Sequence, residues 1–443
     1  MIVFVFKKQR VAVSIIALLV SMNVLASSPE YIESDSIDSK VDNHSPLDYG
    51  FHSPVVLKKY REKLDGVSSF RRDSALTLNM RNYSFYRNYD NAVDVKTSAL
   101  GGGLQYTTGW YRDFLQFESS LYTSQKLYGS SRYASSGLLQ PNQQGYSVLG
   151  KANAKLRYRK SLLTLYRSEL NTPFANQNDI RMTPLLFESY SLLSKDINNV
   201  DLFAAVVKKY KPVNAVRFQS MLKNIDSGNN NPLYILGARY HLADQFSGGV
   251  MAYRVDDYLD IGYVEYQWNQ QWHDYRIGLS QQYIQQRSNG REVGGDISSH
   301  AWGAKLDIEF DSWLWTVAWH DVTGDKMRSD WGSYPGYNSM MVKDFNRADE
   351  TSWRLGFRYD MQVLLKGLSV FGSYIQGDTP ERGKYRSSDE SEFDLTLNYS
   401  VQNRFLKDMN IRLRYANVNQ DFKEGSGNLE DLRLIINYQL PLF

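Results

Sequence analysis

The chain of 443 residues contains no cysteine. Disulfides, thiol catalysis and cysteine metal sites are therefore excluded, and an exported protein of this kind must be held together by another network. Histidine is scarce as well, and none of the six has the spacing of a catalytic or metal-binding motif. They are His44, His52, His241, His273, His300 and His320. The sequence predicts no catalytic residue, no metal and no cofactor.

Long apolar runs are almost absent. The one long run extends from Val11 to Val20, follows three basic residues and precedes a small residue, Ala26. This pattern predicts a cleaved secretory signal at residues 1–26. An uncleaved anchor is the alternative, but the run is shorter than the roughly 20 residues of a spanning helix. No later run is long enough, and the mean hydropathy is −0.48.

Neither sign of charge dominates. Removing the three basic residues of the signal from the chain's 51 lysines and arginines leaves 48, which equals the 48 aspartates and glutamates. The exported chain is formally neutral, so a global basic surface is not supported and no nucleic-acid partner is expected. Any electrostatic function has to come from segregation of charge within the fold.

Aromatic residues and a repeating alternation are abundant. Aromatic side chains make up 14% of the chain, and from about residue 74 apolar residues alternate with polar ones in segments of roughly ten. Examples of the apolar phase are Leu76, Leu78 and Met80; Trp302, Ala304, Leu306, Ile308 and Phe310; and Ile411, Leu413 and Tyr415. A soluble sandwich also alternates, but aromatic residues at segment ends favour a membrane barrel with lipid interfaces.

The connections support this assignment because short and long ones alternate. Short ones are predicted at 160–161, 269–270, 311–312 and 401–408, and long ones at 169–185, 208–231 and 322–350. Short periplasmic turns and long external loops are typical of outer-membrane barrels. The sequence therefore predicts an all-β, transmembrane antiparallel barrel of about 18 strands over residues 74–443.

Two segments have less regular sequences. Residues 27–73 are polar and acidic at first and are predicted to form a periplasmic segment. The long, polar, proline-containing loop at 169–185 contains Asp179 and Arg181. It is predicted to fold inward and constrict the bore; the alternative is an external loop without a role.

The inward phase carries many arginines. They are Arg81, Arg157, Arg159, Arg354, Arg358, Arg412, Arg414 and Arg433. The last two strands and the first become neighbours when a barrel closes, so several of these should form one basic wall. Closely spaced like charges repel, and a row of guanidinium groups can pass a carboxylate along by bidentate contacts. The alternative is that they pair with acidic residues and solvate the lumen.

Four places in the chain resemble the OprD-type porin family. They are Leu78 to Tyr83, with Arg87; Asn178 to Arg181, with Thr183, Pro184 and Phe187; Leu395 to Tyr399, with Ile411 to Arg414; and Asp431 to Tyr438, with Leu440 to Leu442. The resemblance implies an 18-stranded barrel narrowed by inward loops. It also implies a basic ladder that includes Arg81, Arg412, Arg414 and Arg433, with Arg181 at the eyelet.

The function expected from these features is passive diffusion of small, carboxylate-bearing solutes across the outer membrane of a Gram-negative cell. Amino acids, peptides and aromatic acids are the candidate solutes. A porin for neutral oligosaccharides, an outer-membrane enzyme and an adhesin barrel are the alternatives. The expected partners are these solutes, outer-membrane lipid and the outer-membrane assembly machinery, with the chain as a monomer or weak trimer.

Overall fold

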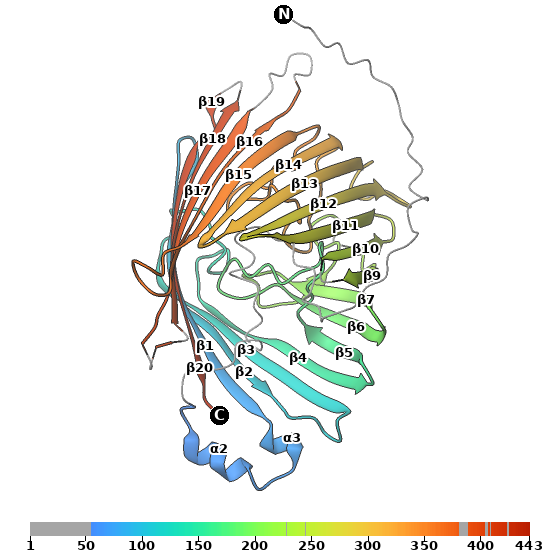
Figure 1. The fold of residues 1–443 in the computed structure, drawn as a ribbon, viewed down its shortest axis with the longest axis vertical. Helices are drawn as coiled ribbons and strands as arrows, with labels where there is room; N and C mark the ends of the chain where they lie inside the picture. Colours follow the sequence, from blue (N-terminus) through green and yellow to red (C-terminus); the bar gives the residue numbers. More distant parts are fainter. Residues whose placement is uncertain are drawn as a thin grey trace, which may run out of the picture.

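A computed structural model describes residues 55–226, 228–243, 245–380, 389–403, 406–407, 409–422 and 425–443. The predicted signal, 1–26, and most of the predicted segment 27–73 lie outside the described residues. The described chain forms a tilted, closed wall of antiparallel strands with two short helices at one end (Figure 1). In this part of the chain, no helix is long and apolar enough to cross a membrane.

The elements follow one another along the chain in the order of their numbers. The helices are α2 (Lys58–Leu64) and α3 (Ser69–Arg72). The first strands are β1 (Ala75–Tyr89), β2 (Val95–Thr107), β3 (Leu115–Gly129), β4 (Tyr146–Tyr158), β5 (Ser161–Ser168), β6 (Leu186–Ile197), β7 (Val200–Lys211), β8 (Gln219–Ser220), β9 (Leu233–Ala243) and β10 (Phe246–Val255). The others are β11 (Leu259–Trp272), β12 (Tyr275–Ser288), β13 (Ser298–Phe310), β14 (Trp313–Gly324), β15 (Thr351–Asp360), β16 (Leu368–Asp378), β17 (Glu390–Ser400), β18 (Met409–Phe422), β19 (Gly425–Ser426) and β20 (Leu429–Pro441).

The barrel is closed by the first and last strands. β1 pairs with β20 from Thr77 opposite Pro441 to Tyr89 opposite Leu429. β8 and β19 have only two residues each, and the other eighteen strands of the described chain form the barrel. The predicted 18-stranded antiparallel barrel is confirmed. Closure leaves no unpaired edge, which a membrane barrel requires.

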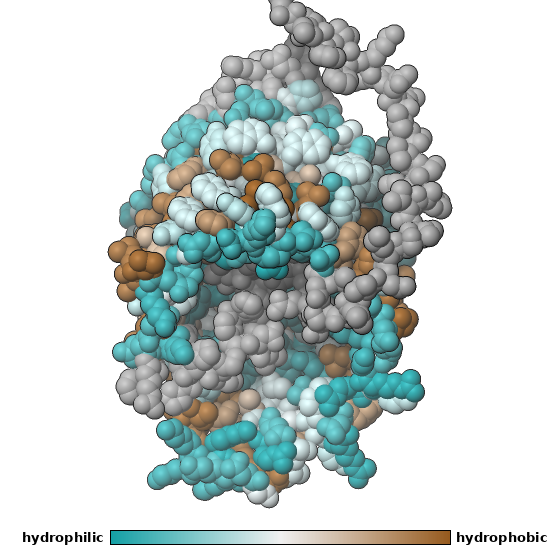
Figure 2. Space-filling model, in the orientation of Figure 1, coloured by the Kyte–Doolittle hydropathy of each residue, from teal (hydrophilic) through white to brown (hydrophobic). Residues whose placement is uncertain are grey.

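Alternation along each strand separates a lipid-facing surface from the lumen. On β15, Trp353 and Leu355 are each 46% exposed, whereas Arg354 between them is 3% exposed. Rings gather on the outer face where strands end: Trp313 stacks on Tyr359 with centroids 4.2 Å apart. Figure 2 shows hydrophobic and pale residues over the outer surface of the strands and hydrophilic residues toward the rims. Such rings mark the membrane interface.

One predicted turn is wrong, and the turn predicted at 160–161 lies one residue earlier, at Arg159 and Lys160. Residues 269–270 lie inside β11, which continues to Trp272, and the turn is formed by His273 and Asp274. The polar run from Asn269 to Gln271 has a turn-like composition. Its backbone groups nevertheless pair with β12, with Gln270 opposite Ile277, so pairing overrides local composition here.

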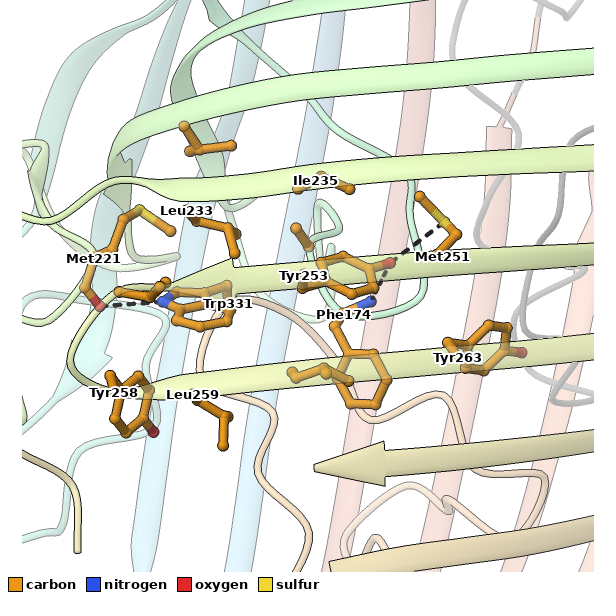
Figure 3. Close-up of a cluster of buried hydrophobic side chains, with 14 of the residues drawn as sticks. Phe174, Met221, Leu233, Ile235, Met251, Tyr253, Tyr258, Leu259, Tyr263 and Trp331 are labelled. Atoms are coloured by element: carbon orange, nitrogen blue, oxygen red, sulfur yellow. Dashed lines mark hydrogen bonds between the residues drawn. The ribbon is translucent and has the colours of Figure 1, made fainter. Parts of the chain in front are cut away.

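The largest apolar core lies inside the barrel. Inward residues of β9 to β11, among them Ile235 and Tyr253, pack against residues of three loops. Phe174 and Trp331 come from two of these loops, and the indole N–H of Trp331 donates to the carbonyl of Met221 in the third at 3.1 Å (Figure 3). On this side the lumen wall is therefore apolar and covered by loops, in contrast to the polar interior typical of wide barrels.

The two ends of the described chain meet at the short-turn rim. The backbone N–H of Leu57 donates to the carbonyl of Leu442 at 2.8 Å. The rings of Tyr60 on α2 and Phe443 pack edge to face at 4.7 Å. Figure 1 shows α2 and α3 at this rim beside the C-terminus. The rim with the short turns and both ends is the periplasmic one.

Candidate functional site

Four arginines on three neighbouring strands share one side of the lumen. We call Arg81 of β1, Arg412 and Arg414 of β18, and Arg433 of β20 the arginine wall. Arg414 lies directly opposite Arg433 in the β18–β20 register. Arg412, Arg414 and Arg433 are all buried, at 5%, 5% and 2% exposure. Closure of the barrel therefore places side by side residues that lie more than 300 positions apart in the chain.

Arg433 is held by a carboxylate of its own strand. Its Nε and one terminal nitrogen donate to the two oxygens of Asp431 at 2.7 and 3.0 Å. Arg87 on β1 contacts the same carboxylate at 2.6 Å. Two guanidinium groups therefore share one buried carboxylate, which holds Arg433 in the wall and Arg87 beside it.

A phenyl ring lies among three guanidinium groups at this point. The guanidinium carbons of Arg433, Arg87 and Arg181 lie 4.8, 5.1 and 5.2 Å from the centroid of Phe85. Phe85 is 1% exposed and stands opposite Arg433 in the β1–β20 register. Cations over an aromatic face are attracted to its quadrupole. The ring thus spaces three positive groups that would otherwise repel one another.

The loop at 169–185 reaches the wall from the opposite side of the lumen. Near its start, the ring of Phe174 packs on Tyr253 of β10 and Tyr263 of β11. Farther along, the carboxylate of Asp179 accepts two hydrogen bonds from Arg81 of β1, at 2.7 and 2.8 Å. The loop therefore crosses the barrel between strands that are far apart around the ring.

Arg181 follows in the same loop and is tied to a second loop. Its Nε donates to the carbonyl of Ser136 at 2.8 Å, and its own carbonyl accepts from Arg81. Burial, together with nearby Arg433 and Arg87, lowers the pKa of the Arg181 guanidinium to about 10. The group keeps its charge at neutral pH, so the loop adds a cation beside the wall.

A third loop, between β14 and β15, also ends on the wall. The backbone N–H groups of Val342 and Lys343 each donate to an oxygen of Glu392 at 2.8 Å. The N–H of Met341 donates to Asp394 at 3.0 Å, and its carbonyl accepts from Arg433 at 3.2 Å. Carboxylates of β17 and an arginine of β20 therefore hold the tip of this loop against the wall.

The other predicted arginines lie elsewhere. Arg354 on β15 donates to the carbonyl of Tyr337 at 3.0 Å, and Arg358 lies 3.8 Å from Glu309. β16 and β17 separate both from β18. Their side chains therefore lie on a part of the barrel wall that is separate from the arginine wall.

Arg157 and Arg159 are found at the periplasmic rim. Arg157, at the end of β4, lies over the ring of Trp110 at 4.3 Å and contacts Asp113 at 3.4 Å. Arg159 is in the turn between β4 and β5 and has a φ of 52°. Since β2 and β3 separate β4 from β1, neither is a neighbour of the arginine wall.

A second charged group lies on β3, on β4 and at the start of the loop at 169–185. Lys151 contacts Glu118 at 3.2 Å and Glu169 at 2.9 Å, and Lys155 contacts Glu118 at 3.0 Å. We call these four residues the lysine–glutamate cluster. They border a cavity of about 310 Å³ that is also lined by Met251 and other apolar residues.

Sequence reasoning missed Lys151, Glu169 and Phe85. Lys151 shares the inward phase of Lys155 on β4, so the alternation could have identified it. Phe85 shares the phase of Arg81, but an apolar residue on a polar phase carries no separate signal. In the part of the chain that the structure describes, no group of three or more histidine, aspartate or glutamate side chains could hold a metal ion.

Comparison with known proteins agrees with this architecture. The family model described as "outer membrane porin, OprD family" matches residues 68–442. The chain belongs to the OprD family. It is 25% identical over 421 residues to Porin D of Pseudomonas aeruginosa, a match that covers 85% of this chain and 93% of that protein.

Solved structures have the same fold as this OprD-family chain. OpdK of Pseudomonas aeruginosa, crystallised with vanillate, superposes with a TM-score of 0.77 at 23% identity, over 84% of this chain and 100% of that one. A BenF-like porin of Pseudomonas fluorescens gives 0.78 at 21% identity with the same coverage. OccK2 of Pseudomonas aeruginosa in complex with glucuronate gives 0.75 at 20% identity, over 85% of this chain and 100% of that one. Family and fold make the protein a substrate-specific outer-membrane transport channel.

Proposed function

We propose that the channel carries small solutes bearing a carboxylate, and that the arginine wall binds this group during passage. The register of β18, β20 and β1 carries the proposal, because it sets Arg414 directly opposite Arg433 and places Arg81 on the next strand. Planar guanidinium groups on adjacent strands offer successive bidentate sites for a carboxylate. Two structural relatives were solved with carboxylates, vanillate and glucuronate, which supports the same solute class.

The wall already binds carboxylates of the protein itself. Asp179 occupies two nitrogens of Arg81, and Asp431 occupies nitrogens of Arg433 and Arg87. The geometry for bidentate recognition is therefore built, and a solute carboxylate would exchange with these internal ones. Exchange between similar partners keeps the free-energy difference between successive positions small, as conduction requires.

In this proposal the loop at 169–185 forms the constriction of the channel. It crosses the lumen, is anchored by Phe174 on one side, and presents Asp179 and Arg181 beside the wall on the other. A solute forced through the remaining opening would pass within reach of the guanidinium groups. The oligomeric state, monomer or weak trimer, stays a prediction.

Liposome swelling tests this function with two solutes of similar size, glucuronate and glucose. We expect the wild-type channel to admit glucuronate faster than glucose, and the double variant Arg412→Ala/Arg414→Ala to lose that preference. Arg254→Ala is the matched control, because this arginine is 56% exposed in its side chain and pairs with Asp256 outside the wall. An unchanged ratio in the double variant would overturn the proposal, as would a wild-type preference for the neutral sugar.

The variants must be shown to fold before their selectivity is compared. Both variants are first required to show the heat-dependent gel shift of a folded barrel. The conservative variant Arg412→Lys/Arg414→Lys keeps the charge but loses the bidentate geometry, so its preference should fall between the other two. If the lysine variant prefers glucuronate as strongly as the wild type does, positive charge alone is enough for selectivity. Bidentate binding of the carboxylate would then no longer be part of the proposal.

A further inference from the structure

The periplasmic turn between β15 and β16 presents three consecutive apolar side chains to the outside. Val363 is 95% exposed, Leu364 73% and Leu365 45%, and Lys366 follows them. This turn projects from the barrel at the left of Figure 1, and Figure 2 shows a hydrophobic patch at the same place. No role in solute passage requires such a surface, because it lies outside the lumen.

Backbone hydrogen bonds hold the turn together. The backbone N–H groups of Leu364 and Leu365 both donate to the carbonyl of Met361 at 2.9 Å. Met361 and Leu368 close the turn, with the N–H of Met361 donating to the carbonyl of Leu368 at 2.9 Å. The five residues 361–365 are therefore held in a single helical turn that leaves the apolar side chains on its outside.

The short periplasmic turns differ from it. The two-residue turns of this rim are entirely polar: Arg159 and Lys160, Asn198 and Asn199, His273 and Asp274, and Asp311 and Ser312. The longer turn at 108–114 also exposes two rings, with Tyr111 and Phe114 each 49% exposed, but one side of it packs against α3, where the rings of Tyr111 and Phe70 are 6.2 Å apart. The apolar tip at 363–365 has no such cover among the described residues.

The tip is continuous with the lipid-facing surface of the barrel. Trp313 and Tyr359 stack on the outer face at the ends of β14 and β15, at the level of the membrane interface. Val363 lies only four residues beyond Tyr359, which is at most about 13 Å of extended chain. The apolar tip therefore lies within reach of the headgroup layer below the ring girdle.

Positive charge accompanies the tip. Exposed Lys366 follows it directly, and the neighbouring turn between β17 and β18 presents exposed Leu406 and Lys407. The two turns are in contact, because the N–H of Ser400 donates to the carbonyl of Gly367 at 2.8 Å. Apolar groups flanked by lysines are the usual composition of a surface that enters a lipid interface, where anionic headgroups meet the ammonium groups.

We infer that Val363, Leu364 and Leu365 insert into the phospholipid interface of the periplasmic leaflet, with Lys366 and Lys407 contacting anionic headgroups. The occupant is lipid rather than a protein, because the tip continues the lipid-facing surface and its flanking charge complements anionic headgroups. The inserted turn would fix the depth and tilt of the barrel on the β15–β18 side. The inference does not depend on which solute the channel carries.

The absence of cysteine makes a direct test possible, since Leu364→Cys introduces the only thiol of the chain. An environment-sensitive fluorophore is attached there, and the channel is reconstituted into vesicles containing phospholipids with a spin label at a shallow acyl position. Ser312→Cys, in the polar turn between β13 and β14, is the matched control. We expect blue-shifted emission and quenching by at least half at position 364, with water-like emission and little quenching at 312.

The lysines are tested in the same vesicles. Adding phosphatidylglycerol to phosphatidylcholine should increase quenching at position 364, and Lys366→Gln/Lys407→Gln should abolish that increase while the channel stays folded. Water-like emission at both positions in pure lipid vesicles would overturn the inference and leave a periplasmic protein as the occupant. Quenching that is insensitive to anionic lipid would overturn the role of the lysines.

Discussion

Lys151 on β4 and Arg433 on β20 are both buried cations of the barrel wall, but their surroundings differ. Lys151 contacts two glutamates, Glu118 at 3.2 Å and Glu169 at 2.9 Å, one of which also contacts Lys155. Arg433 shares its aspartate with Arg87 and faces another arginine across the strand pair. In the lysine–glutamate cluster two lysines balance two glutamates, whereas at the arginine wall two guanidinium groups share Asp431 and Arg414 lies directly opposite Arg433.

This difference separates stability from function. A buried charge that loses its partner is costly, so a balanced cluster fixes strands and loops in place. Like charges set side by side cost free energy and are retained where something else gains from them. On this reasoning we propose that the lysine–glutamate cluster is structural and that the arginine wall serves transport.

The largest effect is expected from Lys151→Met. This change leaves Glu118 and Glu169 without their shared buried cation, and breaking such a pair costs about 3–5 kcal/mol of folding free energy. Urea unfolding in lipid vesicles measures the loss, and adding Glu118→Gln and Glu169→Gln should restore part of it. The preference for glucuronate should stay that of the wild type; a lost preference with intact stability would contradict the division drawn above.

A smaller loss of stability but a larger loss of selectivity is expected from Arg433→Lys. Lysine cannot make the two hydrogen bonds to Asp431 at 2.7 and 3.0 Å, and a hydrogen bond to a charged group contributes about 1.5–3 kcal/mol. Unfolding and swelling are measured on the same preparation. Wild-type selectivity at reduced stability would show that Arg433 is only structural.

A still smaller effect is expected at the contact between the loop at 169–185 and the arginine wall, which Asp179→Asn tests. The amide of asparagine has one acceptor oxygen, so one of the two hydrogen bonds from Arg81 is lost and the other is no longer charge-assisted on both sides, for a loss of about 1 kcal/mol. With the loop held less firmly, the open-channel current should become noisier. Asp179→Glu, which keeps the charge, is the control; equal noise in all three channels would show that this contact does not hold the loop.

The smallest effect concerns Asp344, in the loop whose tip rests on the arginine wall. Burial raises the pKa of the Asp344 carboxyl above its ordinary 3.8, so ionising it opposes folding. This penalty is absent below the ordinary pKa and grows as pH rises through the raised one. Asp344→Asn should therefore be slightly more stable than the wild type at pH 7 and equal to it near pH 3. If the wild type is more stable than the variant at pH 7, the predicted sign of the stability difference is wrong.

The sequence predicted those parts of the fold in which apolar and polar residues alternate regularly along a strand. On β18, Arg412 and Arg414 alternate with Ile411 and Leu413, so both faces could be assigned from the sequence. Over residues 246–267 apolar and polar residues alternate less regularly, and the structure gives the physical reason. On β10 the outward Val250 and the inward Met251 are both apolar, because loops cover the lumen wall there.

The candidate site could be predicted only in part. Barrel closure brings β18, β20 and β1 together, so the grouping of Arg412, Arg414 and Arg433 follows from strand order alone. The contact between Arg81 and Asp179 joins residues 98 positions apart, through a loop whose path the alternation does not encode. Loop paths depend on tertiary packing, such as that of Phe174 against Tyr253.

Single-channel recording in a planar bilayer tests the central claim most directly. Glucuronate added to one side should interrupt the current of the wild-type channel, and the interruptions should be at least tenfold rarer in Arg412→Ala/Arg414→Ala, a difference of about 1.4 kcal/mol. Glucose at the same concentration should interrupt neither channel. Equally frequent interruptions by glucuronate in both channels would contradict the claim that the arginine wall binds the solute carboxylate.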